Sequence, residues 1–348
     1  MTDHEYAPAR RADAAEPRIG GTSLVPVRVP LDGRPSPRLW LKLEAENPFG
    51  SIKARTAEAL LDSLEATGTL RPGRRVVEST SGNLGIALAG LCAVRGYDCT
   101  LVVEPGTPPS SVSRMTAHGA TVVTVGEVPG GRTVDARLDA VRAILRQDPA
   151  AVWTNQYANP ANPGVHAART AVELVKDAPD GGFDAVAVAV STGGTLAGLA
   201  EYFRVRRPAT RVIAVDAVGS AALGGTAAYR PDKLAGFGSG RVSGFVRRHH
   251  WDHLVRLRDA DVAAACARIR QSTGLSLGGS AGAVVLAAVL HAERDPSLRE
   301  VACVCPDSGE KYPRLTDHGP AGPAGVSEEI SAALRLLGRG RLDERTTP

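Results

Sequence analysis

The sequence predicts an α/β fold of two doubly wound domains with mostly parallel sheets. Short apolar runs of strand length recur along the chain, and longer segments with helical periodicity separate them. The length of 348 residues is enough for about two domains with sizeable cores. Aromatic residues make up only 4% of the chain, so alanine, valine and leucine must build these cores.

Six short apolar runs are expected to form buried strands. In chain order they are residues 74–80, 99–104, 121–126, 184–190, 211–217 and 301–306. A helix is expected to begin near residue 53, and further helices are expected at 82–96, 134–147, 165–178, 194–207 and 280–294.

The turn-rich segment NQYANPANPG, residues 155–164, separates two groups of these elements and predicts the crossing between the domains. The ends of the chain are rich in proline, glycine and alanine, which is typical of tails. The predicted division is an N-terminal tail at 1–17, a smaller N-terminal α/β domain at 45–160, a larger α/β domain at 18–44 plus 161–316, and a C-terminal tail with a possible helix at 317–348.

Charge and hydropathy exclude several classes of function. The net charge is only +4, and the basic residues are spread along the chain, so no nucleic-acid partner is expected. The densest basic run, 246–253, is expected to be a solvated face. No run of 18 uncharged apolar residues occurs, so no membrane span is expected.

The cysteines and the N-terminus indicate a reduced, cytoplasmic compartment. The five cysteines show neither zinc-site spacing nor a CxxC pair, so no metal site is expected. The first residues contain no apolar segment of the kind found in a secretory signal peptide.

Lys53 is the first candidate for chemistry. The stretch EAENPFGSIKARTAEALL, residues 44–61, runs from a turn broken by proline and glycine into a helix, with Lys53 in its first turn. The helix dipole disfavours a cation there. One interpretation is a solvated surface lysine, as most lysines are. The other is a nucleophilic amine, because a shielded amine at such a position can form Schiff bases.

The stretch DAVAVAVSTGGTLAG, residues 184–198, predicts a phosphate site. An apolar strand ends in Ser191, Thr192, Gly193, Gly194 and Thr195, and a helix follows. The glycines let the backbone approach a ligand, the hydroxyls add donors, and the helix start supplies N–H groups. The pattern is neither a Walker loop nor a dinucleotide fingerprint. A plain glycine-rich turn explains the residues equally well.

Two more junctions between a strand and the following segment carry polar residues. In ESTSGNLGIALAG, residues 78–90, Thr80, Ser81, Gly82 and Asn83 open a helix, and its bare N-terminus suits a carboxylate. Ser81 can equally be a simple helix cap. Ser308, in VACVCPDSGEKY, follows the last predicted strand and could offer a hydroxyl to a ring nitrogen.

These parts form a coherent set, because open α/β sheets place their active sites where strands end. An amine, a phosphate site, a carboxylate site and a hydroxyl are what is needed to hold pyridoxal phosphate (PLP) and an amino acid. The Schiff base is then expected on Lys53, the phosphate at 191–195 and the substrate carboxylate at 80–83.

The chain resembles the fold-type-II PLP enzymes of the cysteine synthase/cystathionine β-synthase family over residues 18–316. The resemblance rests on NPFGSIKARTA, TSGNLGIALA, STGGT, NQYANPANPGVH, GLSLGGSAGA and PDSGEKY. It implies a tryptophan synthase β-like fold with PLP in the cleft between the domains, and a homodimer. Within the family, GFGSGRVS and the neighbouring motifs look closest to the synthases of the 2,3-diaminopropionate pathway, which serve siderophore and peptide-antibiotic biosynthesis.

The resemblance also implies roles for individual residues. Lys53 holds PLP, Asn83 binds its 3′-oxygen, residues 191–195 bind its phosphate and Ser308 faces its pyridine nitrogen. Gln156 and Thr80 bind the substrate carboxylate. The implied reaction is β-replacement on an activated L-serine through an aminoacrylate, with O-phospho-L-serine and L-glutamate as small-molecule substrates.

The sequence departs from the family at two positions beside the lysine. Ala54 stands where the family usually has Asp, and Phe49 replaces a Gly, while Arg55 remains. No haem-binding segment precedes the core and no regulatory domain pair follows residue 316, which weighs against a cystathionine β-synthase.

Several rival functions stay open. A cysteine synthase shares every PLP residue and differs in its second substrate, sulfide, which needs no cation. An amino-acid nucleophile does need one, and the candidates are Arg132, Arg137 and Arg241, each of which could also be a solvated surface residue. A serine or threonine dehydratase fits GSIKAR less well, and an inactive scaffold protein does not explain the intact motifs.

Overall fold

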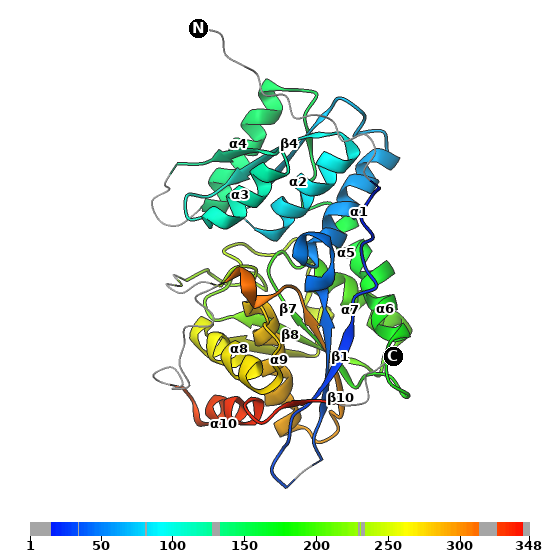
Figure 1. Ribbon diagram of the computed structural model, residues 1–348, viewed down its shortest axis with the longest axis vertical. Coiled ribbons are helices and arrows are strands. Elements are labelled where there is room, and N and C mark those ends of the chain that lie inside the picture. The colour runs from blue at the N-terminus through cyan, green and yellow to red at the C-terminus, as the bar shows by residue number, and fades with distance from the viewer. Residues whose placement is uncertain are drawn as a thin grey trace. The chain divides into compact units, whose positions relative to one another are not determined.

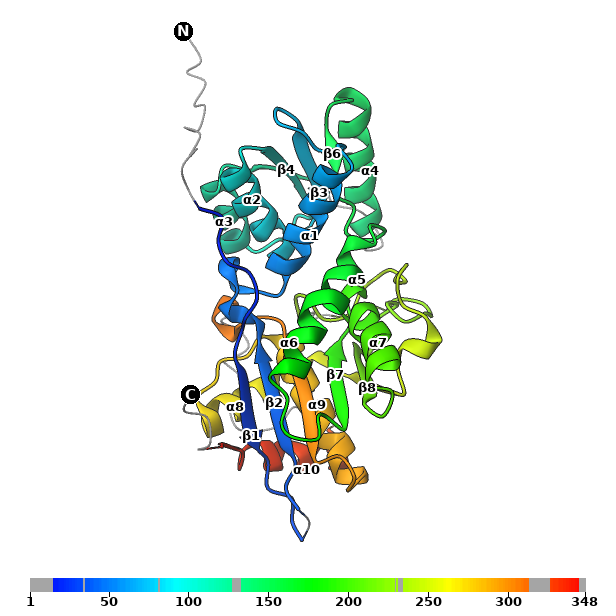
Figure 2. The ribbon, with the colours of Figure 1, turned by 90° about the vertical axis from the view of Figure 1, so that its right-hand side faces the viewer.

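The computed structural model describes residues 15–33, 35–80, 82–126, 133–228, 230, 234–312 and 326–343. They form two compact units (Figures 1 and 2). Unit 1 contains the described residues up to Ile19 together with Lys53–Asn159, and unit 2 contains Gly20–Ile52 and the chain from Pro160 onward. The chain passes from unit 1 to unit 2 within the turn-rich segment 155–164.

Residues 45–52, which the predicted division assigns to the smaller domain, lie in unit 2. The backbone N–H of Ile52 donates to the carbonyl of Pro306 at 2.9 Å. The ammonium of Lys311 donates to the carbonyl of Gly50 at 2.5 Å. These bonds join the turn before Lys53 to the end of a strand of unit 2.

Unit 1 is built on a four-stranded parallel sheet in the order β5-β4-β3-β6. Val77 and Val102 on one face pack against Val141 of α4, and α2 packs on the other side of β3 and β4 (Figure 2). The elements are α1 (Lys53–Ala66), β3 (Arg75–Ser79), α2 (Asn83–Arg95), β4 (Asp98–Val103), α3 (Pro109–Ala117), β5 (Thr121–Thr124), α4 (Thr133–Gln147) and β6 (Val152–Trp153).

Unit 2 is built on a seven-stranded sheet in the order β11-β1-β2-β10-β7-β8-β9. The strands from β2 to β9 in this order are parallel, and β1 runs antiparallel to β2 and β11. The strands are β1 (Leu24–Arg28), β2 (Arg38–Leu43), β7 (Ala185–Ala189), β8 (Arg211–Ala217), β9 (His253–Leu257), β10 (Glu300–Cys305) and β11 (Arg341–Leu342).

Helices cover both faces of this sheet. One face buries alternate residues of β7, β8 and β10 against α8, α9 and α10, and the other buries the intervening residues against α6 and α7 (Figure 1). The helices are α5 (Ala161–Val165), α6 (Ala171–Lys176), α7 (Gly194–Arg206), α8 (Asp259–Thr273), α9 (Gly279–Arg294) and α10 (Glu328–Leu337). Burial on both faces explains why these strands read as continuous apolar runs.

The fold class is the predicted one, and all six predicted strands occur within a few residues of their expected ends. The predicted helix 165–178 is interrupted, because residues 166–170 form a π-helical turn between α5 and α6. Residues 328–342, within the segment described from the sequence as a tail with a possible helix, form α10 and β11 and pack in unit 2. None of the helices in the described ranges has the length and apolar character needed to cross a membrane.

Candidate active site

In each unit the predicted site residues come to one edge of the sheet. Parallel strands end at the same edge, and the helices that connect them begin there. In unit 1 the residues at this edge follow β3 and β6, open α1 and α2, or lie in the second turn of α4: Lys53, Thr80, Gly82, Asn83, Arg137 and Gln156. In unit 2 the same topology brings together residues 191–195, after β7, and Ser308, after β10.

Lys53 is the first residue of α1 and is half-buried. The chain contains five lysines: Lys42, Lys53, Lys176, Lys233 and Lys311. The buried ammonium of Lys42 is ion-paired with two carboxylates of unit 2, and Lys311 donates to a backbone carbonyl. Lys176 is exposed at the end of α6, and Lys233 lies outside the described residues. Among the described lysines, Lys53 is therefore the one that lies at the carboxyl ends of the strands of unit 1.

The turn between β3 and α2 exposes the start of a helix. The backbone N–H of Thr80 donates to the carbonyl of Val102 at 3.0 Å, which anchors the turn to the neighbouring strand. The N–H of Gly82 donates to Oγ1 of Thr80 at 3.4 Å. Asn83 is the first residue of α2, where the N–H groups have no intrahelical acceptor. Ser81 lies outside the described residues.

Gln156 is tied to the end of β3. Its side-chain Nε2 donates to the carbonyl of Ser79 at 2.9 Å, and its backbone N–H donates to Oε2 of Glu78 at 2.9 Å. Burial raises the pKa of Glu78, and hydrogen bonds from Thr154, Gln156, Ser79 and Trp153 oppose that rise. The motif around Gln156 is visible in the sequence, but the role of Glu78 is not.

The three candidate arginines differ in burial. Arg137, on α4, is only 5% exposed, whereas Arg241 is exposed. Arg132 lies outside the described residues. An arginine that is almost fully buried near the strand-end edge of a sheet is unusual, so Arg137 is the stronger candidate for binding an anion.

The loop 191–195 in unit 2 is a rigid start to α7. Gly193 has φ +92°, a conformation that favours glycine, and it is the cap of the helix. A Cβ atom on Gly193 would lie 2.1 Å from Oγ of Ser243, and one on Gly194 would lie 2.1 Å from Oδ1 of Asn162. Both glycines are therefore required by neighbouring segments. The hydroxyl-bearing residues Ser191, Thr192 and Thr195 remain partly exposed.

Two residues that support this loop were not predicted as site residues. Ser243 Oγ donates to the carbonyl of Thr192 at 2.7 Å. The buried ring of His166 is hydrogen-bonded through Nε2 to Oγ1 of Thr195, at 3.3 Å. Both lie in segments that the sequence marks as motifs, NQYANPANPGVH and GFGSGRVS. The N–H of Gly238 donates to the carbonyl of Val190 at 2.8 Å, so the segment containing Arg241 also lies against this loop.

Ser308 follows β10 and caps the short helix Gly309–Lys311. Its Oγ accepts the N–H of Glu310 at 3.2 Å. A hydroxyl that accepts one hydrogen bond still has its own proton to donate. Ser308 therefore keeps a proton to donate, and its bond to a ring nitrogen stays a prediction.

The residues present fit PLP. The loop 191–195 combines a helix start, hydroxyls and two glycines on which no Cβ could be accommodated, which suits a phosphate. Ser308, also in unit 2, offers a neutral hydroxyl, and in unit 1 Lys53 offers an amine and Asn83 a side-chain amide.

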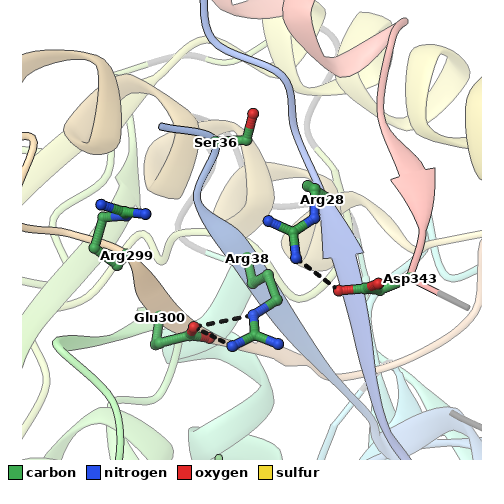
Figure 3. Close-up of a pocket in the computed structure, with 6 residues that line it drawn as sticks. All are labelled: Arg28, Ser36, Arg38, Arg299, Glu300 and Asp343. Atoms are coloured by element: carbon green, nitrogen blue, oxygen red, sulfur yellow. Dashed lines mark hydrogen bonds and ion pairs between the residues drawn. The ribbon is translucent and has the colours of Figure 1, made fainter. Parts of the chain in front are cut away.

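A cavity of about 380 Å³ lies elsewhere in unit 2, where β2 and β10 begin (Figure 3). Two of its three arginines are ion-paired, since Arg38 binds Glu300 at 2.5 Å and Arg28 binds Asp343 at 3.0 Å. Active sites of parallel sheets form at the other edge, where strands end. We therefore do not assign the chemistry to this cavity.

Glu201, His249 and His250 bring three potential metal ligands together on unit 2. Nε2 of His250 lies 2.9 Å from Oε1 of Glu201, and Nδ1 of His250 accepts the backbone N–H of Arg247 at 3.2 Å. A neutral imidazole whose Nδ1 accepts a hydrogen bond carries its proton on Nε2. The nitrogen that faces Glu201 is thus a donor, which is unsuitable for a metal ligand.

The chain is similar to known proteins over most of its length. The family model described as "Pyridoxal-phosphate dependent enzyme" matches residues 15–307. The chain is 38% identical over 296 residues to the N-(2-amino-2-carboxyethyl)-L-glutamate synthase of Ralstonia nicotianae, covering 84% of this chain and 86% of that protein. It is 31% identical over 294 residues to a cysteine synthase of Staphylococcus aureus, covering 84% and 93%.

The fold has a close counterpart among solved structures. An O-ureido-L-serine-bound variant of O-ureido-L-serine synthase is similar with a TM-score of 0.76 and 30% sequence identity, covering 91% of this chain and 96% of that chain. The chain therefore belongs to the family of pyridoxal-phosphate dependent enzymes, in the branch of synthases that replace the β-substituent of serine derivatives.

Proposed function

We propose that this protein joins O-phospho-L-serine to L-glutamate and so makes N-(2-amino-2-carboxyethyl)-L-glutamate for 2,3-diaminopropionate biosynthesis, in the service of a siderophore or a peptide natural product. The C–O bond at Cβ of phosphoserine breaks and phosphate leaves. A C–N bond forms between that Cβ and the amino nitrogen of glutamate, and the proton that this nitrogen loses is taken up by the phosphate. The protein is proposed to act as a cytoplasmic homodimer.

The chain's own residues bind and orient the reactants. PLP, when bound, supplies the electron sink that activates Cα and Cβ of the serine derivative. Lys53 holds the cofactor and moves a proton through its Nζ. Residues 191–195 fix the phosphate of the cofactor, Asn83 fixes its ring oxygen and Ser308 donates to its ring nitrogen.

The substrate carboxylate is assigned to the turn between β3 and α2. Thr80, Ser81, Gly82 and Asn83 offer hydroxyls and the N–H groups of a helix start, and a helix start favours an anion. Gln156 lies at the same edge of the sheet and adds an amide. Both Thr80 and Gln156 are only 5% exposed, so a carboxylate bound there is shielded from competing water.

The observation that carries the choice of an amino acid as second substrate is the burial of Arg137. A dicarboxylic amino acid needs a fixed cation, and the planar fork of arginine binds a carboxylate through two hydrogen bonds. Arg137 is 5% exposed and lies in the second turn of α4, at the edge where β3 ends. Arg241, exposed beside the phosphate loop, is proposed as the cation that receives the leaving phosphate.

A cysteine synthase is the second candidate. The 31% identity to a protein of that name supports it. The buried Arg137 counts against it, because sulfide has no carboxylate for this arginine to bind. Both candidates first release the β-substituent of a serine derivative, and they differ in the nucleophile that replaces it. A cysteine synthase would use sulfide with either O-acetyl-L-serine or O-phospho-L-serine.

One set of assays separates them. Purified holoenzyme is given O-phospho-L-serine or O-acetyl-L-serine, each with L-glutamate or sulfide, and the product is identified by mass. We expect the largest kcat/KM for phosphoserine with glutamate. Cysteine formed from acetylserine and sulfide, without any glutamate adduct, would replace the proposal by cysteine synthase.

The Arg137→Ala variant tests the role of the arginine in the same assay. Loss of a hydrogen bond to a charged group predicts about a ten-fold or greater rise in the KM for glutamate, with little change in the KM for phosphoserine. Arg142→Ala is the matched control, because Arg142 is exposed on the same helix and is paired with Asp139 at 2.6 Å. Equal effects of the two substitutions would contradict the assignment.

A further inference from the structure

Glu78 is a buried carboxylate surrounded by hydrogen-bond donors. It is the fourth residue of β3 and is 0% exposed. Its Oε1 accepts the backbone N–H of Ser79 at 2.7 Å and Nε1 of Trp153 at 3.3 Å. Its Oε2 accepts Oγ1 of Thr154 at 2.6 Å and the backbone N–H of Gln156 at 2.9 Å. All four groups are uncharged.

The geometry requires an all-acceptor side chain at this position. Glutamine would present an NH₂ group where Glu78 presents one of its oxygens, and that group would face donors instead of acceptors. A buried donor left without an acceptor costs about 1–3 kcal/mol. No ion pair to Glu78 exists within the described ranges, so its charge is held by hydrogen bonds and not by a neighbouring cation.

The backbone takes the left-handed conformation beside this carboxylate. Asn155 has φ +52°, one of two described non-glycine residues with positive φ. It stands between the two residues that donate to the same oxygen, Thr154 and Gln156. The left-handed conformation of Asn155 turns the chain so that the side chain of Thr154 and the backbone N–H of Gln156 both reach Oε2 of Glu78. Glu78 thus determines the path of the chain where β6 leads into Gln156.

The same carboxylate also fixes the start of the turn after β3. It accepts the N–H of Ser79, and the carbonyl of Ser79 in turn accepts the side-chain amide of Gln156 at 2.9 Å. Ser79 directly precedes Thr80. One buried group therefore orients both segments to which the substrate carboxylate is assigned.

We propose that Glu78 is a positioning residue for substrate recognition: it holds Gln156 and the turn at 80–83 in the arrangement that binds the carboxylate of the amino-acid substrate. This inference rests on the proposed function in one respect, the assignment of that carboxylate to Thr80 and Gln156. Glu78 itself does not touch the substrate, because its oxygens are occupied by four donors and two carboxylates repel each other.

The test compares Glu78→Gln with the parent protein in two measurements. In the first, the holoenzyme is titrated with O-phospho-L-serine, and the change in visible absorbance gives the dissociation constant. We expect that constant to rise about ten-fold or more, while the amount of bound cofactor and its initial spectrum stay the same. A purely structural role predicts a lower melting temperature with an unchanged dissociation constant, and that result would overturn the proposal.

The second measurement does not depend on the cofactor. Hydrogen exchange of the cofactor-free protein is followed in a peptide that contains Gln156, and we expect the N–H of Gln156 to exchange at least about ten-fold faster in Glu78→Gln. If the parent protein does not respond to phosphoserine but the exchange rate rises, the proposed substrate fails while the positioning role stands. An unchanged exchange rate overturns the positioning role.

Two further variants complete the design. Thr154→Val removes one donor and keeps the carboxylate, so we expect a smaller shift in the same direction for both measurements. If Glu78→Gln does not fold, the result for Thr154→Val decides whether the proposal stands. Glu65→Gln is the control, because Glu65 lies on α1 with its side chain about one-third exposed (33%) and is paired with Arg95 at 3.1 Å. A shift in Glu65→Gln as large as in Glu78→Gln would overturn the proposal.

Discussion

Phe49 occupies a backbone conformation that suits glycine. Its φ is +68° in the turn that precedes Lys53, at a position where the resembling family has a glycine. A bulky residue in the left-handed region costs about 1–3 kcal/mol, and such strain is commonly found at functional sites. The sequence shows the substitution but not the strain, because φ depends on how the turn is anchored to Pro306 and Lys311.

We expect Phe49→Gly to stabilise the protein by about 1 kcal/mol, because glycine adopts this conformation without steric cost. Urea unfolding of the cofactor-free protein measures the difference. Phe49→Ala keeps the strain and removes the ring, so it controls for the side chain. A Gly variant that is no more stable than the Ala variant would show that the turn is not strained.

The local parts of the site could be predicted from sequence, and the long-range parts could not. Lys53, Asn83 and the loop 191–195 each stand beside the strand or helix that positions them, so their neighbours in sequence are sufficient. Glu78 acts on Thr154, which is 76 residues away, and Ser243 acts on Thr192 across 51 residues. Such pairs leave no periodicity or fixed spacing in the sequence. Glutamate, threonine and serine also occur in many other roles, so the residue types alone do not identify the pairs.

At the scale of elements, five of the six predicted strands are buried along most of their length, and the exception is β5, which is largely exposed. β1 and β2 were not predicted, because β1 contains a proline, Arg38 and Lys42 interrupt the apolar run of β2, and neither has the continuous apolar run of a central parallel strand. α10 was expected only as a possible helix within a tail. Its buried residues Ala333, Leu334 and Leu337 nevertheless pack into the core of unit 2.

The contact between α5 and α7 explains the glycine inside α7. A Cβ on Gly198 would lie 2.1 Å from the carbonyl oxygen of Pro163 and 2.9 Å from Cβ of His166. We expect Gly198→Ala to destabilise the protein by about 1–3 kcal/mol, because backbone atoms cannot move away cheaply. Gly164→Ala on α5, where a Cβ meets nothing within 4 Å, is the control. Equal unfolding midpoints for the two variants would contradict this packing.

His291 on α9 makes the stability of the protein dependent on pH. The pKa of His291 is lowered from 6.5 to about 4, mainly by burial and also by the charges of His253, Arg294 and Arg211, while Asp295 opposes the shift. Between these two values the unfolded chain binds the proton and the folded protein does not. The free energy of unfolding therefore falls as the pH drops from 6.5 to 4.

The His291→Gln variant removes this titration. We expect the parent protein to lose more stability than the variant between pH 7 and pH 4, with little difference in the slope above pH 7. Urea midpoints at several pH values give both curves. Parallel curves through the acid range would show that His291 does not contribute.

At the scale of the whole molecule, alternation of strands and helices was enough to predict two α/β units. The chain forms unit 2 from two separate segments, Gly20–Ile52 and the chain after Pro160, and it inserts most of unit 1 between them. The boundary after Ile52 was not evident, because residues 45–52 lead directly into α1 in the sequence. Long-range hydrogen bonds hold them in unit 2, among them those from Ile52 to Pro306, from Lys311 to Gly50 and from Gly20 to Asn47.

The central claim is that a PLP enzyme of this family carries its cofactor on Lys53. The most direct measurement is to reduce the purified holoenzyme with borohydride, digest it and locate the phosphopyridoxyl group by mass spectrometry. We predict a single labelled peptide, with the group on Lys53, and no visible absorbance of bound cofactor in the Lys53→Ala variant. A label on Lys42, Lys176, Lys233 or Lys311 instead, or a reducible adduct that persists in Lys53→Ala, would contradict the account.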